Sequence, residues 1–217
     1  MYSASQVIRT RSQAIEVNSV LRNTYLLLSV TIGVAALTAF TWIQLELPRM
    51  NIFVYLVGFF GLYFAVHKMA NSVWGIVLTF ALAAFIGAAA APLVGFYLKT
   101  DPMIVVQALL LTGVTFVGLS MYTIVRRTDF SWLGQFLMVG FLVVIGVIIL
   151  QFFIDMSPFQ AVLSGFFVIL ACALILFQTS QIVLGGERNY VRATVSLFLS
   201  IYILFMNLLS LLSISDN

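Results

Sequence analysis

The segment "GGERNYVRATVSLFLS", residues 185–200, decides how the chain is interpreted, because a short charged turn leads directly into an apolar stretch. Paired glycines are typical of the end of a helix, since glycine adopts the left-handed conformation at little cost. The apolar stretch that follows is long enough to cross a bilayer, which takes about 20 residues. We therefore expect Gly185, Gly186, Glu187 and Arg188 to form a cytosolic turn between two membrane-spanning helices.

The rest of the chain has the same character. Of its 217 residues, 63% are hydrophobic and 8% are charged, whereas soluble domains carry about 25% charged residues. Long apolar stretches between short polar breaks predict an all-α polytopic membrane protein, because lipid offers no partner for unpaired backbone groups. We expect seven transmembrane helices, at about 24–46, 51–67, 72–98, 102–125, 130–153, 158–184 and 189–213.

Local signals mark several boundaries of these spans. Asp101 and Ser157 each precede a proline, so a capping side chain would stand beside a proline at the first helical position. Asp129 precedes the fifth span, where a carboxylate suits the positive end of the helix dipole. Pro92 lies inside the third span, and we expect it to bend that helix.

Basic residues predict the orientation. With the N-terminus in the cytosol, the inside segments hold eight Lys and Arg residues, and the outside segments hold only Arg49 and Lys99. Such a bias is typical of cytosolic loops. We expect a cytosolic N-terminal tail at residues 1–22, a transmembrane domain at residues 23–217 and a C-terminus outside the cytosol. The tail has no apolar core of the kind that secretory signals carry.

Few side chains suit catalysis or metal binding. Cys172 is the only cysteine and His67 the only histidine, which excludes an intrachain disulfide and a thiolate metal site. An intramembrane serine protease would need a serine and a histidine at matching depth. Ser164 in "VLSGFF" lacks the first glycine of the usual GxSG motif and lies in the outer half of its span, whereas His67 lies at the cytosolic end of another. We expect no enzyme and no cofactor.

The charge balance points to the lipid bilayer as the partner surface. The net charge of +3 is not gathered into a basic run, so it suits loops that face anionic lipid and not a nucleic-acid surface. In the third span, Ala83, Gly87 and Ala91 follow small-xxx-small spacing, which allows helix backbones to approach closely. We expect a packing seam there.

Polar side chains form a line on each of the last two spans, at spacings that keep them close to one helical face. These residues are Gln160, Ser164, Gln178, Arg192, Ser196, Ser200 and Asn207. Two interpretations are open. The groups are either interhelical hydrogen bonds worth about 0.6–2 kcal/mol each or the lining of a polar pathway through the interior. The absence of a buried acid favours the first interpretation, because cation and proton relays usually use one.

Four segments carry a resemblance to a known family: "VLRNTYLLLS" (20–29), "FAVHKMAN" (64–71), "GAAAAPLVGFY" (87–97) and "GGERNYVRATVSLFLSIY" (185–202). They resemble the bacterial YccA branch of the Bax inhibitor-1 family from about residue 20 onward. The resemblance implies seven helices with the last one central, and a location in the bacterial inner membrane. It also implies a regulator that binds the membrane protease FtsH.

Other members of the wider family imply an alternative function, a pH-sensitive calcium or ion leak channel that uses an acid on each of the last two helices. In this chain, Gln178 and Ser200 occupy those two positions. An amide and a hydroxyl cannot share a proton or pair with Ca²⁺ as two carboxylates do. The departure weakens the calcium-leak interpretation.

Overall fold

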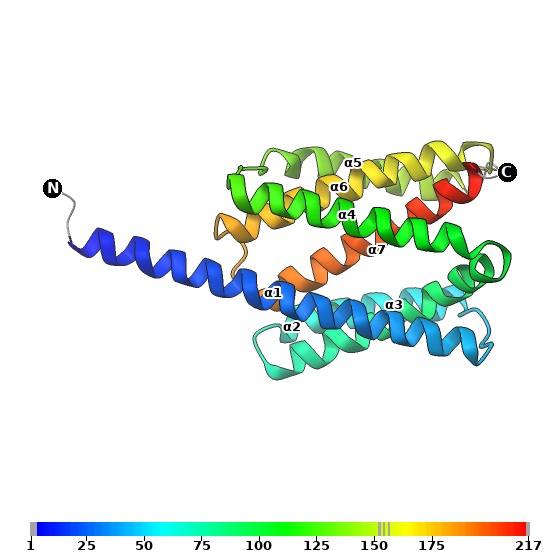
Figure 1. Ribbon diagram of the computed structural model, residues 1–217, viewed down its shortest axis with the longest axis horizontal. Coiled ribbons are helices and arrows are strands. Elements are labelled where there is room, and N and C mark those ends of the chain that lie inside the picture. The colour runs from blue at the N-terminus through cyan, green and yellow to red at the C-terminus, as the bar shows by residue number, and fades with distance from the viewer. Residues whose placement is uncertain (1–3, 152, 154, 156, 216–217) are drawn as a thin grey trace. The chain divides into compact units, whose positions relative to one another are not determined.

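Helices account for nearly all of the computed structural model, which describes residues 4–151, 153, 155 and 157–215 (Figure 1). Side chains are described within these ranges from residue 17 onward, except at 148, 157 and 215. The α-helices are α1 (Ala4–Gln44), α2 (Ile52–Met69), α3 (Val73–Thr100), α4 (Pro102–Arg126), α5 (Leu133–Leu150), α6 (Gln160–Val183) and α7 (Tyr190–Ser215). A 3-10 helix, η1 (Ser157–Phe159), precedes α6. The described residues contain no strand, and the all-α class is confirmed.

Six of these helices are long and apolar enough to cross a membrane, counted over the described residues. The exception is α5, which runs from Leu133 to Leu150. The expected fifth span, 130–153, therefore starts before this helix and ends after it. The Asp129 carboxylate accepts a hydrogen bond from Ser131 N–H at 2.8 Å, and Leu133 N–H donates to Phe130 C=O at 2.9 Å. These bonds form a turn, so Asp129 caps that turn and the helix begins only at Leu133.

The helix α1 begins at Ala4, so the expected division between residues 22 and 23 falls inside a helix, and the cytosolic tail stays a prediction. One other expected boundary was wrong. The sixth helix begins at Gln160 and not at Pro158, because residues 157–159 form a 3-10 turn and Phe159 supplies no side-chain cap. The Ser157 side chain lies outside the described ones.

Other boundaries agree with the sequence. Pro102 is the first residue of α4, and Pro92 lies inside α3. Gly185 has φ +77° directly after the end of α6. That backbone conformation favours glycine, so the expected helix end is confirmed at Gly185.

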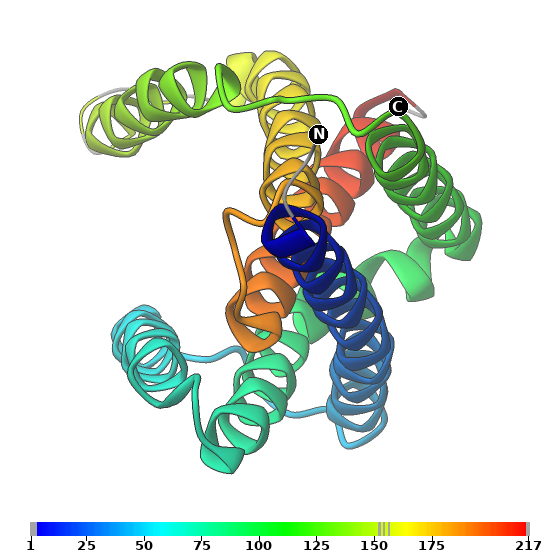
Figure 2. The ribbon, with the colours of Figure 1, turned by 90° about the vertical axis from the view of Figure 1, so that its left-hand side faces the viewer.

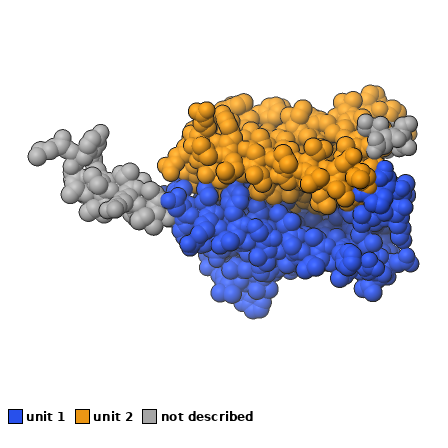
Figure 3. All heavy atoms as spheres, in the orientation of Figure 1, with its two compact units in different colours: residues 1–102, 185–198 blue, residues 103–184, 199–217 orange. Residues whose placement is uncertain are grey.

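The chain divides into two compact units, coloured separately in Figure 3. Unit 1 comprises residues 1–102 and 185–198, and unit 2 comprises residues 103–184 and 199–217. In unit 1, α3 packs against both α1 and α2 (Figures 1 and 2). A Cβ atom on Gly87 of α3 would overlap with the Ala35 carbonyl oxygen of α1. The two backbones therefore meet at this glycine, as the small-residue spacing predicts.

Unit 2 is built around α6. Ala171 and Ile175 of α6 and Leu204 of α7 are fully buried, with Phe116 and Leu119 of α4 packed against them. The helix α5 packs against α6. Residues 190–198 of α7 belong to unit 1, and residues 199–215 belong to unit 2. A central position for α7 within a seven-helix bundle stays a prediction.

Candidate functional site: the polar groups of α6 and α7

Two groups of hydrogen bonds join α6 to the second half of α7 within unit 2. Near the end of α6, Ser200 Oγ donates to Gln178 Oε1 at 3.1 Å, and the Ser200 side chain is buried. Near its start, Ser164 Oγ donates to Ser210 Oγ at 3.0 Å, and Gln160 Nε2 donates to the same oxygen at 3.3 Å. The structure thus brings together four of the expected polar residues with a fifth that the sequence reasoning missed.

Ser210 is that missed residue. It lies three positions after Asn207, on a neighbouring part of the same helical face, so the spacing carried a usable signal. The described hydrogen bond of Asn207 stays within α7, since its Nδ2 donates to Ile203 C=O at 2.7 Å. The two bridging groups thus depend on α6 serine and glutamine side chains that meet serines of α7.

An apolar layer separates the two groups along the helix pair. Ala171 and Ile175 lie on α6 between Ser164 and Gln178, and Leu204 lies on α7 between Ser200 and Ser210. All three apolar side chains have no exposed surface. A continuous polar lining between the two groups would have to pass these apolar side chains. The described contacts of the two groups are hydrogen bonds that join α6 to α7, and a lined pathway stays a hypothesis.

Arg192 and Ser196 lie in unit 1 and not in unit 2. On this part of α7, Ser196 is half-buried and Arg192 is exposed. Arg192 Nη2 donates to His67 C=O at the end of α2 at 3.5 Å. The expected interior position is therefore not found for Arg192, because the first turn of α7 lies beside the polar turn between α2 and α3. Gln160 is likewise exposed, at the start of α6.

The turn at residues 184–189 is organised by Asn189, which the sequence reasoning also missed. Asn189 Oδ1 accepts from Val191 N–H at 2.9 Å and Arg192 N–H at 3.1 Å, which caps α7. Its Nδ2 donates to Ala70 C=O at 3.1 Å and to Asn71 Oδ1 at 2.7 Å. An asparagine before an apolar run is a known N-cap signal. The contact with Ala70, 119 residues away, has no such signal.

The neighbouring turn residues support this arrangement. Glu187 Oε1 accepts from Asn189 N–H at 2.8 Å, and Arg188 Nε donates to Gly185 C=O at 3.4 Å. Gly186 is exposed. These residues hold the shape of the turn through bonds to one another, on the side of the membrane predicted to be cytosolic.

The turn between α4 and α5 is fixed to α6 in a similar manner. Ser180 Oγ donates to Thr128 C=O at 3.1 Å and accepts from Phe130 N–H at 3.0 Å. Hydrogen bonds from the Ser131 hydroxyl and then from its backbone N–H hold the pKa of the exposed Asp129 carboxyl below its usual range. The folded turn therefore stabilises the ionised form of Asp129.

Within the described part of the chain, no three His, Cys, Asp or Glu residues lie close enough together to hold a metal ion. The groups that bridge α6 and α7 are neutral hydroxyls and amides. Their chemistry is hydrogen bonding, and they offer neither a nucleophile with an adjacent base nor a charged ligand set.

Helices of this length and hydropathy, with charged residues in the turns and near the ends of the apolar spans, define a multi-pass α-helical membrane protein. The model of the family described as inhibitor of apoptosis-promoting Bax1 matches residues 17–217. The chain belongs to this Bax inhibitor-1 family, as the four sequence segments predict.

Several relatives cover almost the whole chain. A protein of Pseudomonas aeruginosa with no described function is 43% identical over 204 residues, 93% of this chain and 92% of its own length. The Modulator of FtsH protease YccA of Escherichia coli is 38% identical over 208 residues, 95% of both chains. In a second strain of that species the matching protein is named Inner membrane protein YccA. This chain is likewise a multi-pass protein of the bacterial inner membrane.

A more distant relative matches only in part. The Golgi anti-apoptotic protein of vaccinia virus is 34% identical over 128 residues, 58% of this chain and 53% of its own length. The names of the relatives describe modulators and inhibitors and no enzyme.

Proposed function

We propose that this protein is a non-enzymatic modulator of an FtsH-type membrane protease. The observation that carries the proposal is the 38% identity with the E. coli modulator of FtsH protease over 95% of both chains. The protein would bind the protease within the membrane and slow its proteolysis of other membrane proteins.

The form of α1 suggests how the two proteins would meet. This helix begins at Ala4, and the sequence of residues 4–16 is mostly polar, ahead of the apolar span. About a dozen helical residues therefore precede the span on the predicted cytosolic side. A protease that pulls its substrates from their cytosolic end would engage this segment first, and the packed helices behind it would resist extraction. Resistance to extraction would make the protein a slow, competing substrate.

The experiment uses proteoliposomes that contain the FtsH-type protease and a labelled membrane substrate, with and without this protein. We expect the substrate to be degraded more slowly in its presence, and the protein to co-purify with the protease. Neither slowing nor co-purification would contradict the proposal.

A deletion tests the role of the N-terminal segment. Removal of residues 2–16 should abolish degradation of the protein itself. The deletion stops before Val17, because Val17 Cγ2 lies 3.5 Å from the position of a Cβ on Gly185 and thus borders the turn before α7. A matched control carries an unrelated polar segment of the same length and should be degraded again. Degradation of the deleted form at the intact rate would rule out this segment as the point of engagement.

The alternative function is an ion leak, and the hydrogen-bonded pair Gln178–Ser200 is the observation in its favour. Neutral oxygens can line a water path, although they bind calcium less well than carboxylates. Calcium flux into proteoliposomes of the purified protein, compared with empty vesicles between about pH 6 and pH 8, separates the two functions. Calcium flux above the empty-vesicle level would support the ion leak. No flux above that level would leave the modulator as the remaining function.

A further inference from the structure

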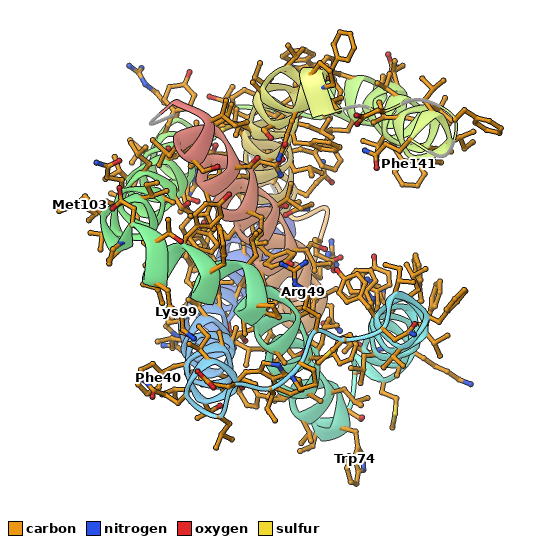
Figure 4. The ribbon with its side chains drawn as sticks, turned by 90° about the vertical axis from the view of Figure 1, so that its right-hand side faces the viewer. Phe40, Arg49, Trp74, Lys99, Met103 and Phe141 are labelled. Atoms are coloured by element: carbon orange, nitrogen blue, oxygen red, sulfur yellow. The ribbon has the colours of Figure 1, made fainter. Side chains whose placement is uncertain are left out.

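A surface pocket of about 320 Å³ lies in unit 1, where the end of α1 meets the last turns of α3. Its apolar wall includes Trp42, Ile43 and Phe96, and its rim carries Glu46 and Lys99. Figure 4 labels Lys99 on α3 beside the end of α1. The pocket thus combines an apolar wall with one carboxylate and one ammonium group.

The two charges of the rim face each other and remain open to a ligand. Lys99 Nζ donates to Glu46 Oε1 at 3.1 Å, while the two side chains are 70% and 77% exposed. An ammonium has three N–H donors and a carboxylate about four acceptor sites, so one mutual bond leaves most of this capacity unused. The rim can hold a positive and a negative group at the same time.

The end of α1 fixes the position of Glu46. Glu46 N–H donates to Ile43 C=O at 3.1 Å and Leu47 N–H donates to Trp42 C=O at 3.2 Å, the bonding pattern of a helix that ends in a left-handed residue. Glu46 takes that conformation, with φ +50°. The exposed ion pair with Lys99 adds little free energy, so the backbone holds Glu46 at the pocket edge and its carboxylate remains available to a ligand.

The pocket lies at the ends of two apolar helices, where a bilayer that they cross would give way to water. Glu46 follows the end of α1 at Gln44, and Lys99 precedes the last residue of α3, Thr100. The wall belongs to the last turns of both helices. Trp42 Nε1 donates to Pro48 C=O at 3.3 Å, so the indole bridges the apolar wall and the polar turn. Tryptophan is enriched at this depth of a bilayer.

We propose that this pocket binds a phospholipid whose headgroup carries both a phosphate and a primary ammonium, as in phosphatidylethanolamine. The phosphate would lie against Lys99, the ammonium would donate to Glu46, and an acyl chain would follow Trp42 and Phe96. A net anionic headgroup is disfavoured because Glu46 stands beside the only lysine of the rim. A choline headgroup lacks the N–H groups that Glu46 accepts.

The test measures the fluorescence of Trp42, which lines the pocket. The full chain with Trp74→Phe and Trp132→Phe keeps Trp42 as its only tryptophan and is reconstituted in phosphatidylcholine. Phosphatidylethanolamine, phosphatidylglycerol or phosphatidylcholine with brominated acyl chains is then added, since bromine quenches a tryptophan that it approaches. We expect half-quenching by the ethanolamine lipid at about a fivefold lower mole fraction than by the other two.

Matched variants assign the preference to the rim. Glu46→Gln should remove the preference for ethanolamine over choline lipid, and Lys99→Gln should weaken binding of every headgroup. Arg49→Gln changes a charge that does not line the pocket (labelled in Figure 4) and should leave the preference intact. Both rim side chains are largely exposed, so folding should survive all three changes.

A second reporter controls for lipid that merely surrounds the protein. The variant with Trp42→Phe and Trp132→Phe keeps Trp74, which is exposed at the opposite end of α3. It should show no headgroup preference. Equal quenching of Trp42 by all three lipids, stronger quenching by the glycerol lipid, a preference that survives Glu46→Gln, or the same preference at Trp74 would each overturn the proposal.

Discussion

The contact of α1 with α3 in unit 1 and the contact of α6 with α7 in unit 2 hold helices together by different means. At the first, Gly87 lets the α3 backbone approach the Ala35 carbonyl of α1 so closely that no side chain fits between them. At the second, hydroxyl and amide groups bridge the helices at 3.0–3.3 Å, on either side of an apolar layer.

The difference follows from the solvent. Lipid tails are as apolar as leucine, so burial of apolar surface gives little drive for two helices to associate in a bilayer. Association then depends on close van der Waals packing, which needs small residues, or on hydrogen bonds, which need polar ones. In unit 1, α1 and α3 pack closely at Gly87. In unit 2, hydrogen bonds join α6 to α7 on either side of an apolar layer. The two contacts should therefore respond differently to substitution.

The largest effect is expected from charges placed in the α6–α7 contact. Gln178→Asp together with Ser200→Asp would put two carboxylates where the native oxygens lie 3.1 Å apart. Each acid costs about 2.5–3.5 kcal/mol on an insertion scale. Two like charges cannot both ionise cheaply, so the pair should share a proton at low pH and lose stability as the pH rises, unless calcium binds. Thermal unfolding in detergent against pH, with and without calcium, measures this.

The control for that pair is Gln178→Asn with Ser200→Asn, which keeps polar groups without charge and should show neither response. We expect the native protein to show little calcium dependence. Strong acid-tunable calcium flux through the native protein would contradict the expectation, and Glu187 and Asp155 would then be the first acids to substitute.

A smaller effect is expected at the α1–α3 contact. Gly87→Ala would force a methyl group against the Ala35 carbonyl, and overpacking of this kind costs about 1–3 kcal/mol. Gly33→Ala on α1 is the matched control, because a Cβ there meets nothing within 4 Å. The control should be neutral or stabilising by up to about 1 kcal/mol, since alanine favours a helix over glycine. Unfolding titrations in mixed micelles give both values, and equal costs would show that no tight contact exists.

The hydrogen bonds themselves should contribute less. A double-mutant cycle with Ser200→Ala and Gln178→Leu isolates the bond between these two side chains. We expect a coupling free energy of about 0.6 kcal/mol and at most about 1.7 kcal/mol, the range found between membrane helices. Ser29→Ala is a suitable control, because Ser29 Oγ donates to Tyr25 C=O of its own helix. A coupling near zero would mean that the bond between Gln178 and Ser200 does not help to hold α6 against α7.

The smallest effect is expected at Asp129, outside both contacts. Its carboxyl pKa is lowered by the hydrogen bonds from Ser131. Stability from this group is therefore fully present above the usual pKa of an aspartate and is lost as the pH falls through the lowered value. Asp129→Asn should remove this pH dependence, and above about pH 5 it should be slightly less stable than the native protein because the contribution of the ionised carboxylate is gone. Unfolding of both forms between about pH 2 and pH 7 provides the test.

The sequence by itself determined the membrane class, the number of helices and most of their ends. These properties depend on features close together in the chain. Backbone groups in lipid must be satisfied within each helix, so an apolar run predicts a helix without any knowledge of its neighbours. Pro102 fixes its own φ, whereas Gly185 tolerates the positive φ that follows a helix, and both mark helix ends that the structure has. The sequence did not predict the late start of α5, because Asp129 suits a turn as well as a helix cap.

Only the tertiary structure decided which polar groups meet. Ser210 joins Ser164 over 46 residues, Glu46 joins Lys99 over 53, and Asn189 joins Ala70 over 119. Periodicity shows which face of a helix is polar and cannot show what that face touches. Helical spacing also could not reveal the apolar layer that divides the α6–α7 line, because Leu204 comes from one helix and Ile175 from another. Such contacts depend on the depth and rotation of each helix, and those are set by packing between helices.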